Sequence, residues 1–328
     1  MDTVNTETKP QYGGQAIVEG VMFAGRKAYV SAIRRKDGRI DYLEVERTER
    51  EWMKQLKKIP LIRGNVALIE AAANGSKHLN FSTERYDVDP EDDAQLANVK
   101  QSKLTMILGV AFIGVLSFAL SKIIFTALPA IMAHSLFKAW FPGHIEQNLI
   151  EGMIKTLLLL GYIYLISLTP LVKRLFQYHG AEHKVINCYE QNKPLTVEHV
   201  QACSRLHYRC GSSFILFTII IGVFLYLFVP SEPLWERILY RLALIPVVIG
   251  VSYEVLQLTN KCRNIPVLKY LGYPGLAVQL LTTKDPTDDQ VEVAIASFKR
   301  LLEREQALNP MAADQVQTDQ ARPYVYQS

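Results

Sequence analysis

The chain has few charged residues and none of the marks of a disordered protein. Charged residues make up 21% of its 328 residues against 49% hydrophobic ones, with 18 glycines and 15 prolines. These values exclude collagen-like, low-complexity and intrinsically disordered chains. The formal net charge is only +4 and no basic cluster stands out, so nucleic acid is not expected as a partner. The first ten residues lack an apolar stretch, so we expect no cleaved secretory signal.

Long apolar runs are what the chain has in abundance. They lie near residues 104–121, 156–172, 212–229 and 238–258. A helix needs about 20 mostly apolar residues to cross a bilayer, and an uncharged run of 18 or more is a strong candidate. We therefore predict a mainly α polytopic membrane protein with four transmembrane helices, a small N-terminal β-containing cytosolic unit and a cytosolic helical hairpin.

Lysine and arginine in the connecting loops predict the orientation. Residues 173–211 contain six of them, whereas residues 134–148 contain only Lys138. Because basic residues resist translocation, we place residues 173–211 and both termini in the cytosol. In a reducing cytosol Cys188, Cys203 and Cys210 are expected to be thiols or metal ligands rather than disulfides.

The polar stretches predict soluble units on either side of the apolar runs. Glycines in residues 11–25 predict tight strand pairing, and Asp37-Gly38 predicts a hairpin between residues 29–35 and 40–46. Helices are predicted over residues 49–58 and 64–79. The predicted organisation is a disordered N-terminus (1–10), a cytosolic α+β unit (11–81), an acidic linker (82–103), a four-helix membrane domain (104–260), a cytosolic segment with an amphipathic helix (261–304) and a disordered tail (305–328).

The cytosolic loop 173–211 carries the motif with the clearest chemistry. Asn192-Lys193-Pro194 interrupts two helical patterns, and Thr196 is the expected N-cap of the second helix. In the first helix, residues 179–183 read H-x-x-E-H, the reversed zincin order, which puts His179 and His183 on one side. Such a pair can hold a divalent metal while Glu182 polarises its bound water. A water-facing helix with incidental histidines is the alternative.

A second group of possible ligands follows in the same loop. Cys203, His207 and Cys210 are spaced i, i+4 and i+7, which on a helix is one face. Thiolate and imidazole are ligands that Zn²⁺ prefers, so this group could share a site with the histidine pair. Cysteines that simply fill the core are the alternative.

Glu254 is the third candidate, because a carboxylate near the cytosolic end of a span is costly unless it is paired or binds a cation. Its partner could be the metal, or else Arg205, Lys261 or Arg263. Further residues have no spacing argument: Glu19, His199 and Gln257 are weaker candidates, and His78, His134 and His144 are expected at the surface or an interface.

Several of these motifs together resemble a known family. They are GGQAIVEGVM (13–22), Arg63-Gly64, HGAEHK (179–184), CSRLH (203–207), Arg209-Cys210-Gly211, Pro274-Gly275-Leu276, Gln279 and LTT (281–283). On these residues the chain resembles the YqhQ-like bacterial membrane proteins, a family of unknown function (DUF1385). Phe23-Ala24-Gly25 and Tyr208 depart from the family's usual Met-Arg-Gly and Pro. The resemblance implies a multispanning protein of the bacterial cytoplasmic membrane with a metal site and no assigned reaction.

The favoured hypothesis is a metal-dependent enzyme, hydrolytic in type, at the cytosolic membrane surface. His179 and His183 would bind the metal, most readily Zn²⁺, with Glu182 as general base or further ligand. Glu254 or the group Cys203, His207 and Cys210 would complete the site. The first alternative is a non-catalytic scaffold or membrane assembly protein in which a structural zinc site holds the cytosolic helices together. A small transporter using Glu254 is least favoured because there is no inverted repeat. The bilayer is the expected partner, and a homo-oligomer is left open.

Overall fold

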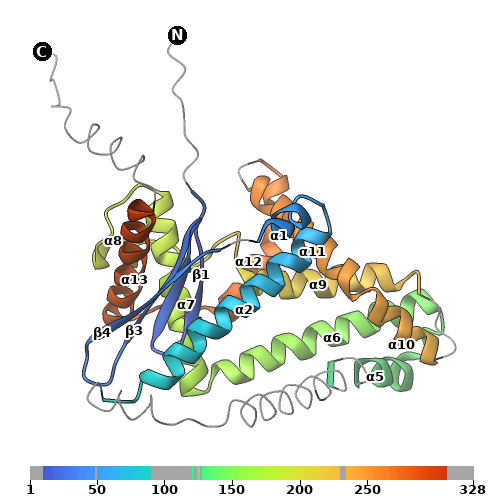
Figure 1. The fold of residues 1–328 in the computed structure, drawn as a ribbon. Helices are drawn as coiled ribbons and strands as arrows, with labels where there is room; N and C mark the ends of the chain where they lie inside the picture. Colours follow the sequence, from blue (N-terminus) through green and yellow to red (C-terminus); the bar gives the residue numbers. More distant parts are fainter. Residues whose placement is uncertain are drawn as a thin grey trace, which may run out of the picture.

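The computed structural model describes residues 10–48, 50–89, 120, 124–125, 128–229, 234–263 and 265–308. These residues form a sheet covered by helices, and a layer of further helices that projects from one side of it (Figure 1). The predicted first span, residues 104–121, lies outside the described residues except for Leu120, as does most of the predicted linker.

The described strands form one antiparallel sheet in the order β1 (Gly13–Ile17), β2 (Gly20–Ala24), β3 (Ala28–Arg34) and β4 (Ile40–Glu46). The predicted strand pairing within residues 11–25 and the predicted hairpin at Asp37-Gly38 are both confirmed. The β3–β4 turn uses Gly38 at φ +86°, a conformation that side chains with a Cβ avoid. At the β1–β2 turn Glu19 adopts φ +53°, and Arg174 donates two hydrogen bonds to its carboxylate.

One face of the sheet packs on α7 (Pro170–Glu190) and α13 (Asp288–Ala307). The short α8 (Val197–Gln201) packs against these two helices. Phe298 of α13 is fully buried, with its ring 5.0 Å from that of Phe23 and 5.1 Å from that of Tyr12. The predicted amphipathic helix is thus confirmed. It extends past residue 304 because Glu305 accepts hydrogen bonds from the Tyr12 hydroxyl and the Lys27 amide, so residues 305–307 are not part of a disordered tail.

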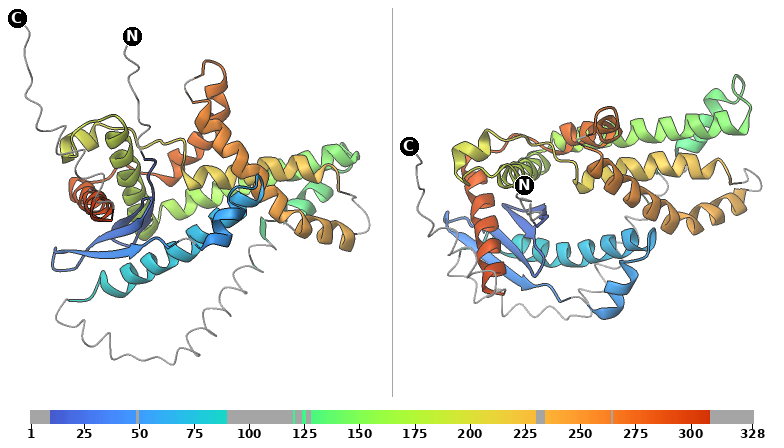
Figure 2. Two further views of the ribbon diagram at one scale, coloured as in Figure 1. Left: turned by 45° about the horizontal axis from the view of Figure 1, so that its top comes forward. Right: turned by 90° about the horizontal axis from the view of Figure 1, so that it is seen from above.

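The opposite face is covered by α2 (Ile62–Arg85), which follows the short α1 (Glu51–Leu56). Figure 2 shows α2 and α13 on opposite sides of the sheet. The helix is longer than the predicted 64–79, since Phe81 packs under the sheet and Arg85 lies over its ring. The predicted surface position of His78 is wrong: the side chain is fully buried, with Nδ1 2.6 Å from the Ser31 hydroxyl.

The projecting layer contains α5 (Leu128–Phe137), α6 (His144–Ser167), α9 (Gly211–Tyr226), α10 (Leu234–Ala243), α11 (Ile245–Lys261), the 3₁₀ turn η3 (Leu268–Gly272) and α12 (Tyr273–Thr282). In the described part of the chain, α6 alone is long and apolar enough to cross a membrane, while α5 and α9 are shorter apolar helices.

The apolar runs predicted as spans do not coincide with the observed helices. The fourth predicted span is broken at Leu244, where α10 ends and Pro246 occupies the first turn of α11. The predicted 156–172 run ends early, because α6 stops at Ser167 and Pro170 begins α7. The predicted 134–148 loop is shorter, because α5 and α6 both extend into it. The number of spans stays a prediction.

Candidate metal centre

The two histidines of the H-x-x-E-H motif lie on the same side of α7. One helical turn separates them, and their ring centroids are 4.5 Å apart. His183 is buried and His179 is half-buried. The motif therefore places two imidazoles side by side, as the helical spacing predicts.

Both imidazoles are oriented by backbone carbonyl groups. Nδ1 of His179 is 2.8 Å from the carbonyl oxygen of Thr282, and Nδ1 of His183 is 2.6 Å from that of Arg205. A carbonyl oxygen can only accept, so each Nδ1 carries a proton and each Nε2 keeps a lone pair. The same arrangement orients histidines that ligate metals.

Cys210 completes a group of three possible ligands. Its Sγ lies 3.2 Å from Nε2 of His179, and the ligand atoms of His179, His183 and Cys210 all lie within 4.8 Å of one another. Cys210 is also the N-cap of α9, where the Ser212 amide donates to its sulfur. Two imidazoles and a thiolate are donors that suit Zn²⁺ and leave its fourth position open.

A cavity of about 280 Å³ lies beside these three side chains, and Glu182 lines it. The carboxyl group is buried and has no hydrogen-bond partner among the described residues. Burial raises the pKa of Glu182 to about 7, although the nearby imidazole of His179 acts in the opposite direction. Gly14 of β1 closes the other side, since a Cβ there would lie 2.9 Å from the Glu182 carboxyl carbon. The glycine-rich first strand therefore makes room for this carboxylate.

The predicted helical face of Cys203, His207 and Cys210 is wrong. Helix α8 ends at Gln201, and residues 202–210 form an irregular loop. Cys203 lies in the core, where its thiol donates to the His199 carbonyl, and it stays outside the group of possible ligands.

His207 and Glu254 also stay outside that group. His207 lines the cavity with its ring 5.8 Å from that of His183, but its Nε2 faces Glu190 at 3.7 Å, and burial lowers its pKa. Glu254 pairs with Arg63, not with any of the three partners considered from the sequence. The weaker candidates lie elsewhere: Glu19 against Arg174, His199 against Thr196, and Gln257 in a separate pocket.

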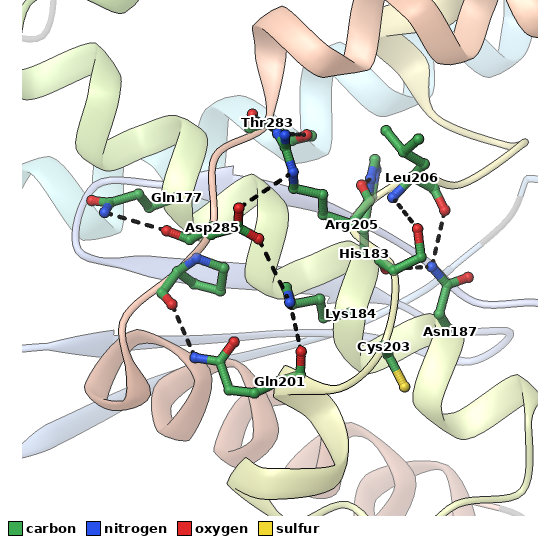
Figure 3. A network of polar contacts seen from close by, with 12 residues as sticks. Gln177, His183, Lys184, Asn187, Gln201, Cys203, Arg205, Leu206, Thr283 and Asp285 are labelled. Carbon is green, nitrogen blue, oxygen red and sulfur yellow. Dashed lines mark hydrogen bonds and ion pairs between the residues drawn. The ribbon is translucent and has the colours of Figure 1, made fainter.

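A network of polar contacts holds the 202–210 loop and residues 283–286 against α7 (Figure 3). Lys184 donates to the Gln201 carbonyl at 2.7 Å and lies 3.7 Å from Asp285. Arg205 pairs with the same carboxylate and donates to Thr283. Asn187 donates to the carbonyls of Ser204 and Leu206. This network fixes the segments whose carbonyls orient His179 and His183. Sequence reasoning missed it because carbonyl groups carry no sequence signal.

Comparisons with known proteins give a family and a close relative. A family model described as "Protein of unknown function (DUF1385)" matches residues 59–304. The "Uncharacterized protein YqhQ" of Bacillus subtilis (strain 168) is 62% identical over 298 residues, which cover 90% of this chain and 93% of that protein. No solved structure matches the chain.

Proposed function

The chain belongs to the DUF1385 family, as its motifs indicate, and because that family is described as of unknown function we propose a function from the site itself. The protein is a metal-dependent hydrolase of the bacterial cytoplasmic membrane, with its metal centre on the cytosolic face. The observation that carries this proposal is the convergence of two imidazole Nε2 atoms and one thiol on a cavity lined by a buried carboxyl group.

The donor set fits zinc. His179, His183 and Cys210 would hold the ion, and the Nδ1 bonds to Thr282 and Arg205 would keep both rings in place. A zinc ion at this position would supply a Lewis acid and lower the pKa of a bound water.

Glu182 has the position and the protonation behaviour of a general base. It lines the same cavity and lies on the same helix, one residue before His183. Burial raises the pKa of this carboxyl group, which suits a group that takes up a proton and releases it again.

The exposed apolar surface supports a place in the membrane. Only 22% of the most apolar 18-residue window of α6 is buried within the protein. Leu157 and Leu165 of this helix are 62% and 64% exposed, and Phe224 of α9 is 57% exposed. A buried core helix would be covered on all sides, whereas this apolar surface suits lipid. Washing cell membranes with alkaline carbonate should leave the chain in the pellet, and release into the supernatant would contradict the membrane part.

Elemental analysis of the purified full-length protein tests the metal centre. The wild type should contain stoichiometric zinc, and His183→Ala and Cys210→Ala should lose it. Cys203→Ala is the matched control, because this buried free cysteine lies outside the site. Equal zinc in Cys210→Ala and Cys203→Ala, or no zinc in the wild type, would refute the site.

Glu182→Gln then tests catalysis. The variant should keep its zinc while failing to replace the wild-type gene in a deletion strain. Full function of this variant would end the catalytic proposal.

The scaffold alternative makes a different prediction. A structural zinc site has four protein ligands, whereas the described residues supply three beside a cavity, which favours the enzyme. If a chelator unfolds the cytosolic part, the structural role gains support, since structural zinc contributes directly to folding.

A further inference from the structure

A second and larger pocket, called here the basic pocket, lies between the first hairpin of the sheet, α2 and α11. Its volume is about 650 Å³. Four basic side chains and one carboxylate line it: Arg47, Lys57, Arg63, Lys261 and Glu70. Nothing in the proposed metal chemistry uses these residues.

The positive charge of the basic pocket exceeds the negative charge that faces it. Glu70 pairs with Arg47 at 2.8 Å and with Lys57 at 2.5 Å. Glu254, just outside the lining, pairs with Arg63, and Lys261 lies close enough to act on its charge. Among the residues that the structure describes, two carboxylates therefore face these four cations. A concave surface with excess positive charge attracts anions, and arginine and lysine together are well suited to phosphate.

The basic pocket adjoins the cavity of the metal centre. Gly13 and Gly14 of β1 line both. Because neither has a side chain, only the backbone of this strand end separates the two spaces. A Cβ added to Gly13 would meet no atom within 4 Å, so the space around it is open. A molecule that fills the basic pocket therefore lies next to the cavity of His179, His183 and Cys210, across this strand end.

The segments beside the basic pocket carry exposed apolar side chains. Ile59, Leu61 and Ile62, which lie between the lining residues Lys57 and Arg63, are 45%, 43% and 41% exposed. Trp52 of the neighbouring α1 is 56% exposed. Basic side chains beside exposed tryptophan and aliphatic residues are typical of a surface that meets a bilayer at the level of its headgroups.

We propose that the basic pocket binds the phosphate of an anionic amphiphile, such as a phospholipid headgroup, and that this amphiphile is the substrate class of the metal centre. The part about the substrate rests on the proposed hydrolase, but the binding of phosphate does not. A soluble phosphate compound would use the same chemistry, so the experiment includes both sources.

Binding is measured on the full-length protein in a neutral detergent, both as purified and after treatment with a chelator. The probes are short-chain phosphatidylglycerol, short-chain phosphatidylcholine and inorganic phosphate. We expect phosphatidylglycerol to bind more tightly than phosphatidylcholine. Lys261→Gln should weaken its binding about fivefold, which corresponds to about 1 kcal/mol for one basic residue. Lys58→Gln is the matched control, because this exposed lysine follows Lys57 but does not line the pocket.

Each outcome decides the inference. Inorganic phosphate that binds as tightly as phosphatidylglycerol, and depends equally on Lys261, supports the pocket with a soluble phosphate compound as its ligand. Equal binding of the two lipids, or an equal effect of Lys58→Gln and Lys261→Gln, overturns the pocket. Lipid binding is also measured in chelator-treated protein, which has no zinc. Loss of lipid binding can therefore be told apart from loss of the zinc site.

The contact between the two sites has its own test. Cobalt replaces zinc in the purified protein, and the ³¹P relaxation of bound phosphatidylglycerol is compared between the two forms. Paramagnetic cobalt should speed the relaxation if the phosphate lies beside the metal centre. The same relaxation rate in both forms would overturn the link between the basic pocket and the metal centre.

Discussion

Replacing Gly180 with alanine should damage the fold and the metal centre together, because this glycine lies where another backbone segment crosses α7. A Cβ at this position would be 2.0 Å from the carbonyl oxygen of Lys284, which is far inside contact distance. The Lys284 amide donates to the Phe176 carbonyl at 2.9 Å, so this segment is fixed to the helix on both sides of the contact. The backbone must therefore shift.

The magnitude follows from two opposing effects. Overpacking of this kind costs about 1–3 kcal/mol, while alanine gains up to about 1 kcal/mol over glycine in a helix. Because the clash is with a backbone atom, the cost lies at the upper end, and a net loss of about 2 kcal/mol in the free energy of unfolding is expected. The shift also moves Thr282, whose carbonyl orients His179. Loss of such a supporting bond lowers metal affinity about 10- to 100-fold.

Denaturant unfolding and zinc competition against a chromogenic chelator measure the two effects on one sample. Gly161→Ala is the matched control, since a Cβ at Gly161 of α6 meets no atom within 4 Å. It should leave zinc affinity unchanged. If Gly180→Ala unfolds at the wild-type denaturant concentration and binds zinc as tightly as Gly161→Ala, the close contact has no influence and the reasoning fails.

Two further predictions concern the two faces of the sheet. Phe298→Ala should lower the free energy of unfolding by about 3–5 kcal/mol, because its fully buried ring packs on Phe23 and Tyr12; a loss below about 1 kcal/mol in denaturant unfolding would contradict this packing. His78 has its pKa lowered from 6.5 to about 4, chiefly by burial, and its Nε2 has no partner among the described residues. The folded state therefore favours the neutral imidazole. The contribution of His78 to the free energy of unfolding is complete above pH 6.5, and it is lost at about 1.4 kcal/mol per pH unit as the pH falls towards 4. His78→Gln should flatten this part of the curve of unfolding free energy against pH, and equal slopes in both proteins would argue against it.

The elements that depend on local sequence could be predicted. Asp37-Gly38 places a hairpin turn, Thr196 caps α8 through the His199 amide, and the spacing of Val291, Phe298 and their neighbours gives α13. In each case residues a few positions apart determine the backbone. The pairing of His179 with His183 belongs to the same class, because a helix alone brings them together.

The remaining part of the site depends on contacts between distant residues. The choice of Cys210 over Cys203 follows from the path of the 202–210 loop, in which the His207 amide donates to Gln279, 72 residues away. Arg63 reaches Glu254 across 191 residues. No spacing in the chain indicates such pairs, since they arise only when α2, α11 and α12 have packed.

The core that joins β1–β3 to α13 also affects how the protein is made. The strands leave the ribosome well before the helix that supplies Phe298 and Leu301 to their apolar face. During synthesis the part of that face that α13 covers stays exposed while the helices between β4 and α13 are made, even after α7 has packed on the rest. A nascent chain of this design is open to aggregation and to capture by chaperones until α13 has emerged. Truncation before residue 288 would therefore leave the apolar face of the sheet without α13.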